Sequence, residues 1–192
     1  MISPFEYVTV LISIILGMGI TQIVSGLAQI IHRWEKVRIY WPHLVLIILV
    51  FIIHIQEWWI IYEMEDLKYW RLATFLFTIL YPVNLYILAR ILFPIDWKDG
   101  VVDLKLFYYQ NFRRIYLFII SLDVLAIIDN VLISGYAIRD QLPQLSILTV
   151  LAIVASRNKR NEFVHHSVAV FLLLIAFITI ALTWNTLLIQ NH

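Results

Sequence analysis

The sequence predicts an all-α, polytopic integral membrane protein, a bundle of six transmembrane helices with short loops. The first reason is composition: of 192 residues, 62% are hydrophobic and 14% are charged, against about 45–50% and about 25% in soluble domains. The second is the length of the apolar runs, because a membrane-spanning helix needs about 20 predominantly apolar residues and the chain contains six such runs in succession. We expect residues 1–192 to form one transmembrane domain whose surroundings are the lipid bilayer.

The expected helices follow the boundaries of these runs and lie at residues 3–31, 41–62, 71–93, 112–133, 142–156 and 163–189. The first begins with a capping pattern, in which Ser3 is the N-cap, Pro4 takes the first helical position and Glu6 follows three residues after the cap. The fifth is the shortest, since about 15 residues at about 1.5 Å each do not cross a full hydrocarbon core. Residues 94–111 form the longest connection, and their mixture of apolar, aromatic and basic side chains is typical of a segment in the membrane interface.

The lysine and arginine residues predict the orientation of the bundle. Eleven of them follow the first, third and fifth helices, and three lie on the opposite side. The eleven are Arg33, Lys36, Arg38, Arg90, Lys98, Lys105, Arg113, Arg114, Arg157, Lys159 and Arg160, and the three are Lys68, Arg71 and Arg139. Because cytoplasmic loops carry an excess of Lys and Arg, we expect both termini to lie on the non-cytoplasmic side.

Composition and motifs also disfavour several classes of function. The net charge is only +1, so no global basic field suggests a nucleic acid partner. The chain has no cysteine, which excludes disulfides, thiolate metal sites, iron–sulfur clusters and cysteine nucleophiles. It also lacks a phosphate-cradling glycine loop and a G-x-S-x-G motif. We therefore do not expect an enzyme.

Small and polar residues recur at every fourth position of the first helix. This ladder consists of Ser13, Gly17, Thr21, Ser25 and Gln29. Small residues at this spacing let two membrane helices approach closely, and hydroxyl groups can hydrogen-bond across the contact. We expect the ladder to be a helix-packing face inside the protein. The alternative is that it lines a polar path.

Ionisable and polar side chains interrupt three of the apolar runs. His54 and Asp123 lie near the middle of the second and fourth helices, Asn84 lies in the third, and Glu57 and Asp129 lie further outward. A carboxylate at mid-membrane costs about 2.5–3.5 kcal/mol on insertion scales, so such groups face the bundle interior or water and indicate function by default. If these three helices are neighbours, His54, Asn84 and Asp123 share one layer, with Glu57 and Asp129 above it.

This pattern predicts a cation or proton pathway, in a small channel or transporter that assembles as a homo-oligomer. The outer acids would attract the ion, since an acidic mouth concentrates cations. His54, whose imidazole titrates near neutral pH, would pass or gate it together with Asp123.

Two alternatives from other classes remain open. In the first, the polar residues only fix helix contacts, His54 with Asp123 and Asp129 with Arg139, in a structural or signalling subunit that recruits a cytoplasmic partner through residues 94–114. In the second, the protein binds haem or a metal ion, since imidazoles on facing helices can ligate either. The candidate ligands, all at the expected cytoplasmic ends of helices, are His32, His43, His165 and His166. Otherwise no cofactor is expected.

Overall fold

Six helices account for most of the chain in the structure, a computed structural model that describes residues 4–63, 71–95, 97, 100–157 and 160–183. They are α1 (Pro4–His32), α2 (Trp41–Glu63), α3 (Leu72–Ile91), α4 (Leu104–Ile128), α5 (Leu142–Arg157) and α6 (Glu162–Thr183). With the short helical turns that flank α4 and α5, all six segments are long and apolar enough to cross a membrane. The all-α class and the six apolar helices are therefore confirmed, and the chain is an integral membrane protein.

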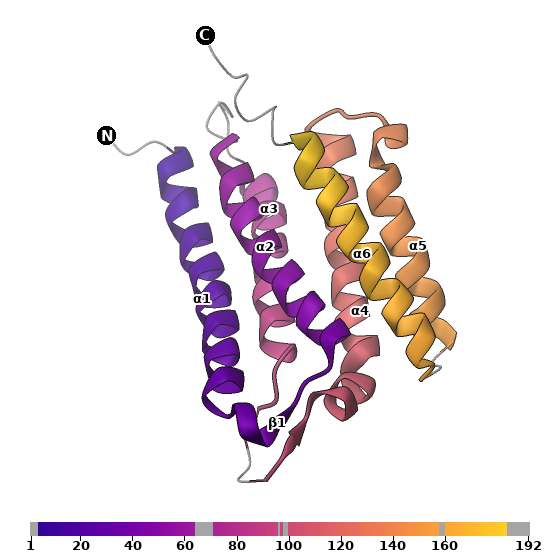
Figure 1. The fold of residues 1–192 in the computed structure, drawn as a ribbon. Helices are drawn as coiled ribbons and strands as arrows, with labels where there is room; N and C mark the ends of the chain where they lie inside the picture. The colour runs from indigo at the N-terminus through magenta and orange to yellow at the C-terminus, as the bar shows by residue number, and fades with distance from the viewer. Residues whose placement is uncertain (1–3, 64–70, 96, 98–99, 158–159, 184–192) are drawn as a thin grey trace.

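The six helices run side by side, so the bundle has two ends (Figure 1). We call the end where α1 begins and α6 finishes the terminal end. At the opposite end, β1 (Val37–Arg38) and β2 (Val102–Asp103) pair in parallel, with Val37 opposite Val102. We call this the sheet end. The pairing ties the α1–α2 connection to the segment before α4, which the sequence did not predict.

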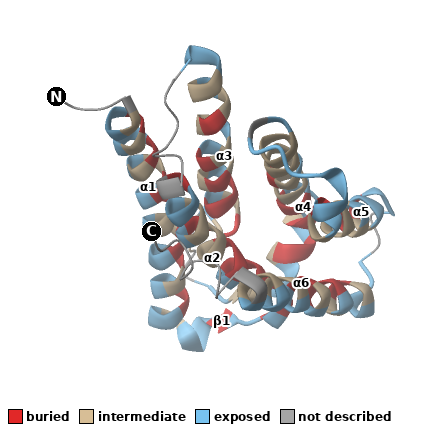
Figure 2. Ribbon diagram, turned by 90° about the horizontal axis from the view of Figure 1, so that it is seen from above, coloured by how far each residue is buried: buried red, intermediate tan, exposed pale blue. Residues whose placement is uncertain are grey.

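Five helices close a ring, and the sixth packs on its outside. Helix α2 packs against α3, α3 against α4, α4 against α5 and α5 against α6, which returns to α2. Helix α1 lies outside this ring and packs against α2 and α3 (Figure 2). The expectation that the second, third and fourth helices are neighbours therefore holds in the structure.

Helix α4 begins at Leu104, inside the segment 94–111 that we expected to be an interfacial loop. The carboxylate of Asp103 caps it by accepting a hydrogen bond from the backbone N–H of Leu106, at 3.0 Å. Tyr108 and Phe112 are then fully buried. Because these aromatic residues are packed against the bundle core, the helix extends further toward the sheet end than its apolar run indicates.

The other helix boundaries lie close to the expected ones. A short 3₁₀ turn, η4 (Ile138–Gln141), precedes α5, and together they provide a 20-residue span from Ile138 to Arg157. The fifth helix is therefore long enough to cross the membrane. The expected cap at Ser3 and the expected end of the sixth helix at residues 184–189 lie outside the described residues.

Helix α1 packs against its neighbours with a different face from the one expected. Its buried residues are Val8, Ile12, Leu16, Gly19, Ile23, Gly26 and Ile30. In the ladder, Ser13 is half-buried, whereas Gly17, Thr21, Ser25 and Gln29 are exposed. On this face Gly19 and Gly26 allow close approach, because the ring of His54 packs against Gly19 and that of Phe93 against Gly26. Inside this chain the ladder is not the packing face, so a packing role for it stays a prediction about contact with another chain.

Candidate functional site

Three carboxylates lie in the half of the bundle nearer the terminal end, on the neighbouring helices α2 and α4, and Tyr81 of α3 relates the deepest of them to the other two. Glu57 comes from α2, Asp123 from α4, and Asp129 from the first position of a π-helical turn, η3 (Asp129–Ile133), that continues α4. Glu57 and Asp129 are close enough to interact electrostatically. Tyr81 on α3 interacts electrostatically with both Glu57 and Asp123. We call these four residues the acidic layer.

A side-chain hydrogen bond holds α3 against α4 beside this layer. The Asn84 amide nitrogen donates to the Ser121 hydroxyl, which in turn donates to the backbone carbonyl of Phe118 at 2.8 Å. Asn84 Oδ1 and Asp123 Oδ2 are buried and accept no hydrogen bond from the described residues. Both atoms are hydrogen-bond acceptors, and of the two only the carboxylate oxygen can take up a proton near neutral pH.

The acidic layer has no cationic partner among the described side chains. The ion pairs among the described residues all lie near the two ends of the bundle. They are Arg38–Asp103, Lys105–Glu162, His166–Glu162 and Arg139–Asp140. Arg139, considered from the sequence as a partner of Asp129, instead lies 3.8 Å from Asp140. The layer therefore combines three acids without the positive charge that usually accompanies buried carboxylates.

The π-helical turn is a feature that the sequence did not reveal. It ends at a bend in which Gly135 adopts a left-handed conformation, with φ of 73°. The Asn130 amide donates to the Gln141 side-chain oxygen at 2.7 Å, which fixes the turn to η4. This turn ends α4, where π-type turns and a left-handed glycine are usual, and it places Asp129 at its first position.

His54 lies apart from the acidic layer, at the contact between α2 and α1. Its ring is fully buried, and Nδ1 donates to the backbone carbonyl of Val50 at 2.7 Å. The ring fits against Gly19, where a Cβ atom would overlap it. Nε2 has no hydrogen-bond partner among the described residues. The expected hydrogen bond between His54 and Asp123 is thus absent, because these two side chains leave their helices toward different neighbours.

Three of the four histidines considered as ligands border one aromatic cluster, in which His43 and His165 contact the Tyr108 ring and His166 contacts the Tyr40 ring. His43 Nε2 donates to the Leu92 carbonyl at 2.9 Å, and His166 Nε2 lies 3.7 Å from Glu162. His165 is buried, and His32 is exposed at the end of α1. Over the described part of the chain, no three His, Asp or Glu side chains are placed to hold a metal ion.

Sequence reasoning missed a hydrogen-bonded network around His165. The hydroxyl groups of Tyr108 and Tyr116 lie 2.6 Å apart, and both reach His165 Nδ1, at 2.8 and 3.3 Å. Tyr40 and Tyr109 form a second hydroxyl pair at 3.2 Å. The available signal was the spacing of Tyr108, Phe112 and Tyr116, which recur every four residues and so share one face of a helix. The network joins α4 and α6 at the sheet end, and the second pair joins the residue before α2 to α4.

No family model matches the chain, and neither a curated protein nor a solved structure matches it either. Its class is consequently defined by the structure: an integral membrane protein of six helices with an acidic layer between α2, α3 and α4.

Proposed function

We propose that this protein provides a pathway for protons or another monovalent cation, with the acidic layer as its binding region. The observation that carries the proposal is the gathering of Glu57, Asp123 and Asp129 on neighbouring membrane helices without a cationic partner among the described residues. Asn84, which braces α3 against α4, completes the site.

Energetics supports a role in binding positive charge. Each carboxylate at mid-membrane costs about 2.5–3.5 kcal/mol on insertion scales, and like charges at short range raise that cost. A layer that only joined helices would be served by neutral amides, as in the hydrogen bond between Asn130 and Gln141. A bound proton or cation offsets the cost of placing the three carboxylates in the membrane. The presence of these carboxylates therefore favours a site that binds and releases a proton or cation.

Asp129 and Glu57 are the members of the layer nearest the terminal end, and in this proposal they receive the ion. Asp123, one to two turns deeper on α4, is the next acceptor through its unpartnered oxygen. His54 takes no part in transfer in this proposal, because its ring faces α1 and its only hydrogen bond among the described residues is to its own helix. Its role is to seat α1 on α2.

The proposal predicts opposite results for two residues that are one helical turn apart. In proteoliposomes with a proton or potassium gradient, Glu57→Gln should lower the flux at least about ten-fold, the scale at which removing a transfer group acts. His54→Ala should keep most of the wild-type flux while lowering the melting temperature, since it opens a cavity beside Gly19. Equal flux in the wild type and Glu57→Gln, with both proteins folded, would leave the helix-contact alternative as the better explanation.

A further inference from the structure

Three arginines at the sheet end of α4 and α5 have no acidic partner among the described residues. They are Arg113, Arg114 and Arg157, and all three side chains are exposed. Of the acids described at that end, Asp103 pairs with Arg38 and Glu162 with Lys105 and His166, while Glu35 forms no ion pair with a described residue. We call these three residues the arginine cluster.

The cluster lies at one depth of the bundle. Asn130 and Gln141 are hydrogen-bonded across α4 and α5 near the terminal end. Arg114 precedes Asn130 by sixteen residues, and Arg157 follows Gln141 by sixteen residues. Because the two helices are antiparallel neighbours with the same rise of about 1.5 Å per residue, both arginines lie about 24 Å from that hydrogen bond. Arg113 directly precedes Arg114 in the sequence and so lies at nearly the same depth.

This depth corresponds to the boundary of the hydrocarbon core. The 20-residue segment from Ile138 to Arg157 is about 30 Å long, which is the thickness of the core of a typical bilayer. The span on α4, Leu104 to Leu132, is 29 residues long, and so exceeds the core by several turns. The part of α4 before Arg113 therefore extends past the core, and the cluster lies at the level of lipid headgroups.

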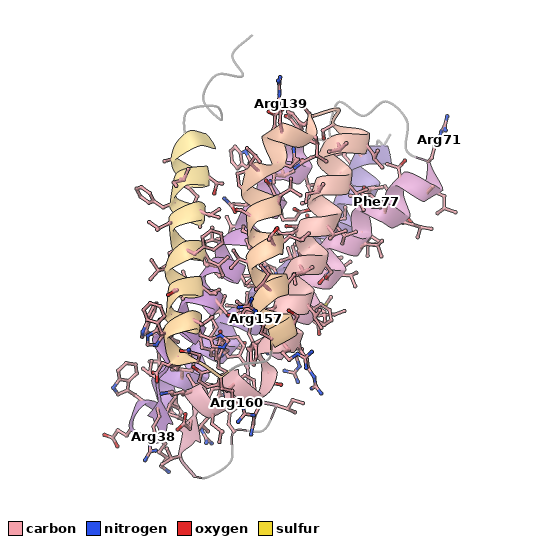
Figure 3. All side chains as sticks on the ribbon, turned by 90° about the vertical axis from the view of Figure 1, so that its right-hand side faces the viewer. Arg38, Arg71, Phe77, Arg139, Arg157 and Arg160 are labelled. Carbon is pink, nitrogen blue, oxygen red and sulfur yellow. The ribbon has the colours of Figure 1, made fainter. Side chains whose placement is uncertain are left out.

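The terminal end of the bundle also carries arginines, which can be compared with those of the cluster. Among the residues shown in Figure 3, Arg71 and Arg139 project from the terminal end, while Arg38, Arg157 and Arg160 lie toward the sheet end. Arg139 lies 3.8 Å from Asp140. Both terminal-end arginines are exposed, so they provide matched controls for the cluster.

We propose that the arginine cluster binds the phosphate of an anionic phospholipid. Guanidinium groups form bidentate hydrogen bonds with phosphate oxygens, and basic residues between membrane helices at the headgroup level bind anionic lipids. Arg113 and Arg114 are adjacent in the sequence and carry like charges without an acidic partner among the described residues, and a phosphodiester at their depth would supply the counter-charge. A lipid fits better than a soluble anion because the cluster lies where lipid phosphates are concentrated. This inference does not depend on the proposed pathway.

The test uses the full chain in phosphatidylcholine nanodiscs with traces of spin-labelled phosphatidylglycerol or phosphatidylcholine. The fraction of each labelled lipid whose motion is restricted measures how much of that lipid is bound at the protein surface. The ratio of the two fractions gives the preference of the protein for phosphatidylglycerol over phosphatidylcholine. The wild type should prefer phosphatidylglycerol at least about five-fold. The triple variant Arg113→Gln, Arg114→Gln, Arg157→Gln should lose this preference, and the control Arg71→Gln, Arg139→Gln should keep it.

Two results would overturn the inference: equal restriction of both lipids by the wild type, or an unchanged preference in the folded triple variant. The latter would mean that these arginines are only solvated charges. Displacement of the labelled phosphatidylglycerol by inorganic phosphate, but not by sodium chloride at the same ionic strength, would assign the cluster to a soluble anion instead. If the triple variant does not fold, Arg157→Gln alone should still reduce the preference. Added salt should also weaken the preference of the wild type, because screening acts on exposed charges.

Discussion

Replacing Asp123 by asparagine should abolish ion flux through the wild-type pathway, and it is the substitution with the largest expected effect on function. Asp123 lies at the deep side of the acidic layer, interacts electrostatically with Tyr81, and keeps one carboxylate oxygen buried without a hydrogen-bond partner among the described residues. Asparagine preserves the shape of the side chain but cannot take up a proton, and it carries no charge for a cation. We expect flux in proteoliposomes to fall at least about a hundred-fold, within the range found when a proton-transfer group is removed.

The matched control for this variant is Asp140→Asn. Asp140 is an exposed acid near the terminal end, 3.8 Å from Arg139 and outside the acidic layer. It should leave flux within about two-fold of the wild type, because an exposed surface ion pair contributes little. Equal losses in both variants would indicate a general effect of acids near that end. Unchanged flux in Asp123→Asn would remove this residue from the pathway.

Gly19→Leu should strongly destabilise the packing of α1 on α2. A Cβ atom at Gly19 would overlap the imidazole of His54, so a leucine there would force α1 away from α2. Overpacking of this kind costs typically about 1–3 kcal/mol in free energy of unfolding. The loss should appear as a lower melting temperature in detergent. Combining it with His54→Ala should recover part of the loss, since the smaller side chain makes room for the leucine.

Gly17→Leu is the matched control on the same helix. Gly17 lies two residues away on the exposed face, and no other element of the described chain comes within 4 Å of the position that a Cβ atom would take there. The stability of the monomer should therefore stay within the small range of surface substitutions, about 0.5 kcal/mol. A change in oligomer mass caused by Gly17→Leu would show that the ladder contacts another chain. Equal destabilisation by the two substitutions would contradict the packing of α1 described above.

The sequence predicted which segments form helices long and apolar enough to cross a membrane, because that information depends on the length of the apolar runs. It also predicted the approximate depth of Glu57, Asp123 and Asp129, since depth follows from counting residues along a helix. The rotation of each helix was harder to predict. A helix that is apolar on every side carries no amphipathic signal, and so His54 was assigned toward Asp123 although its ring packs against Gly19.

The ladder on α1 is a second case in which the sequence did not predict how a helix is rotated in the bundle. Its spacing of four correctly identified a single face of the helix, but a regular face can contact either the same chain or another one. The buried face is recognised by its large aliphatic residues, including Ile12, Leu16 and Ile23. In a membrane, such residues are equally suited to lipid and to a neighbouring helix, so the sequence alone could not decide between the two faces.

Contacts between distant segments account for the remaining differences. The early start of α4 depends on the Asp103 cap and on aromatic packing that includes His165, 57 residues from Tyr108. The pairing of Val37 with Val102 joins two strands of only two residues each, too short for any alternation to be recognised. The π-helical turn at Asp129 likewise involves the Gln141 side chain across a bend. None of these contacts leaves a periodic pattern in the sequence.

The central claim, that the acidic layer conducts protons or another monovalent cation, is tested most directly by the wild-type protein alone. Purified protein in liposomes, loaded with a pH-sensitive dye for a proton gradient or a potassium-sensitive dye for a potassium gradient, should dissipate one gradient faster than empty liposomes do. The gradient that collapses identifies the ion. If neither gradient collapses faster than in empty liposomes, while the reconstituted protein is folded and inserted, the claim is contradicted.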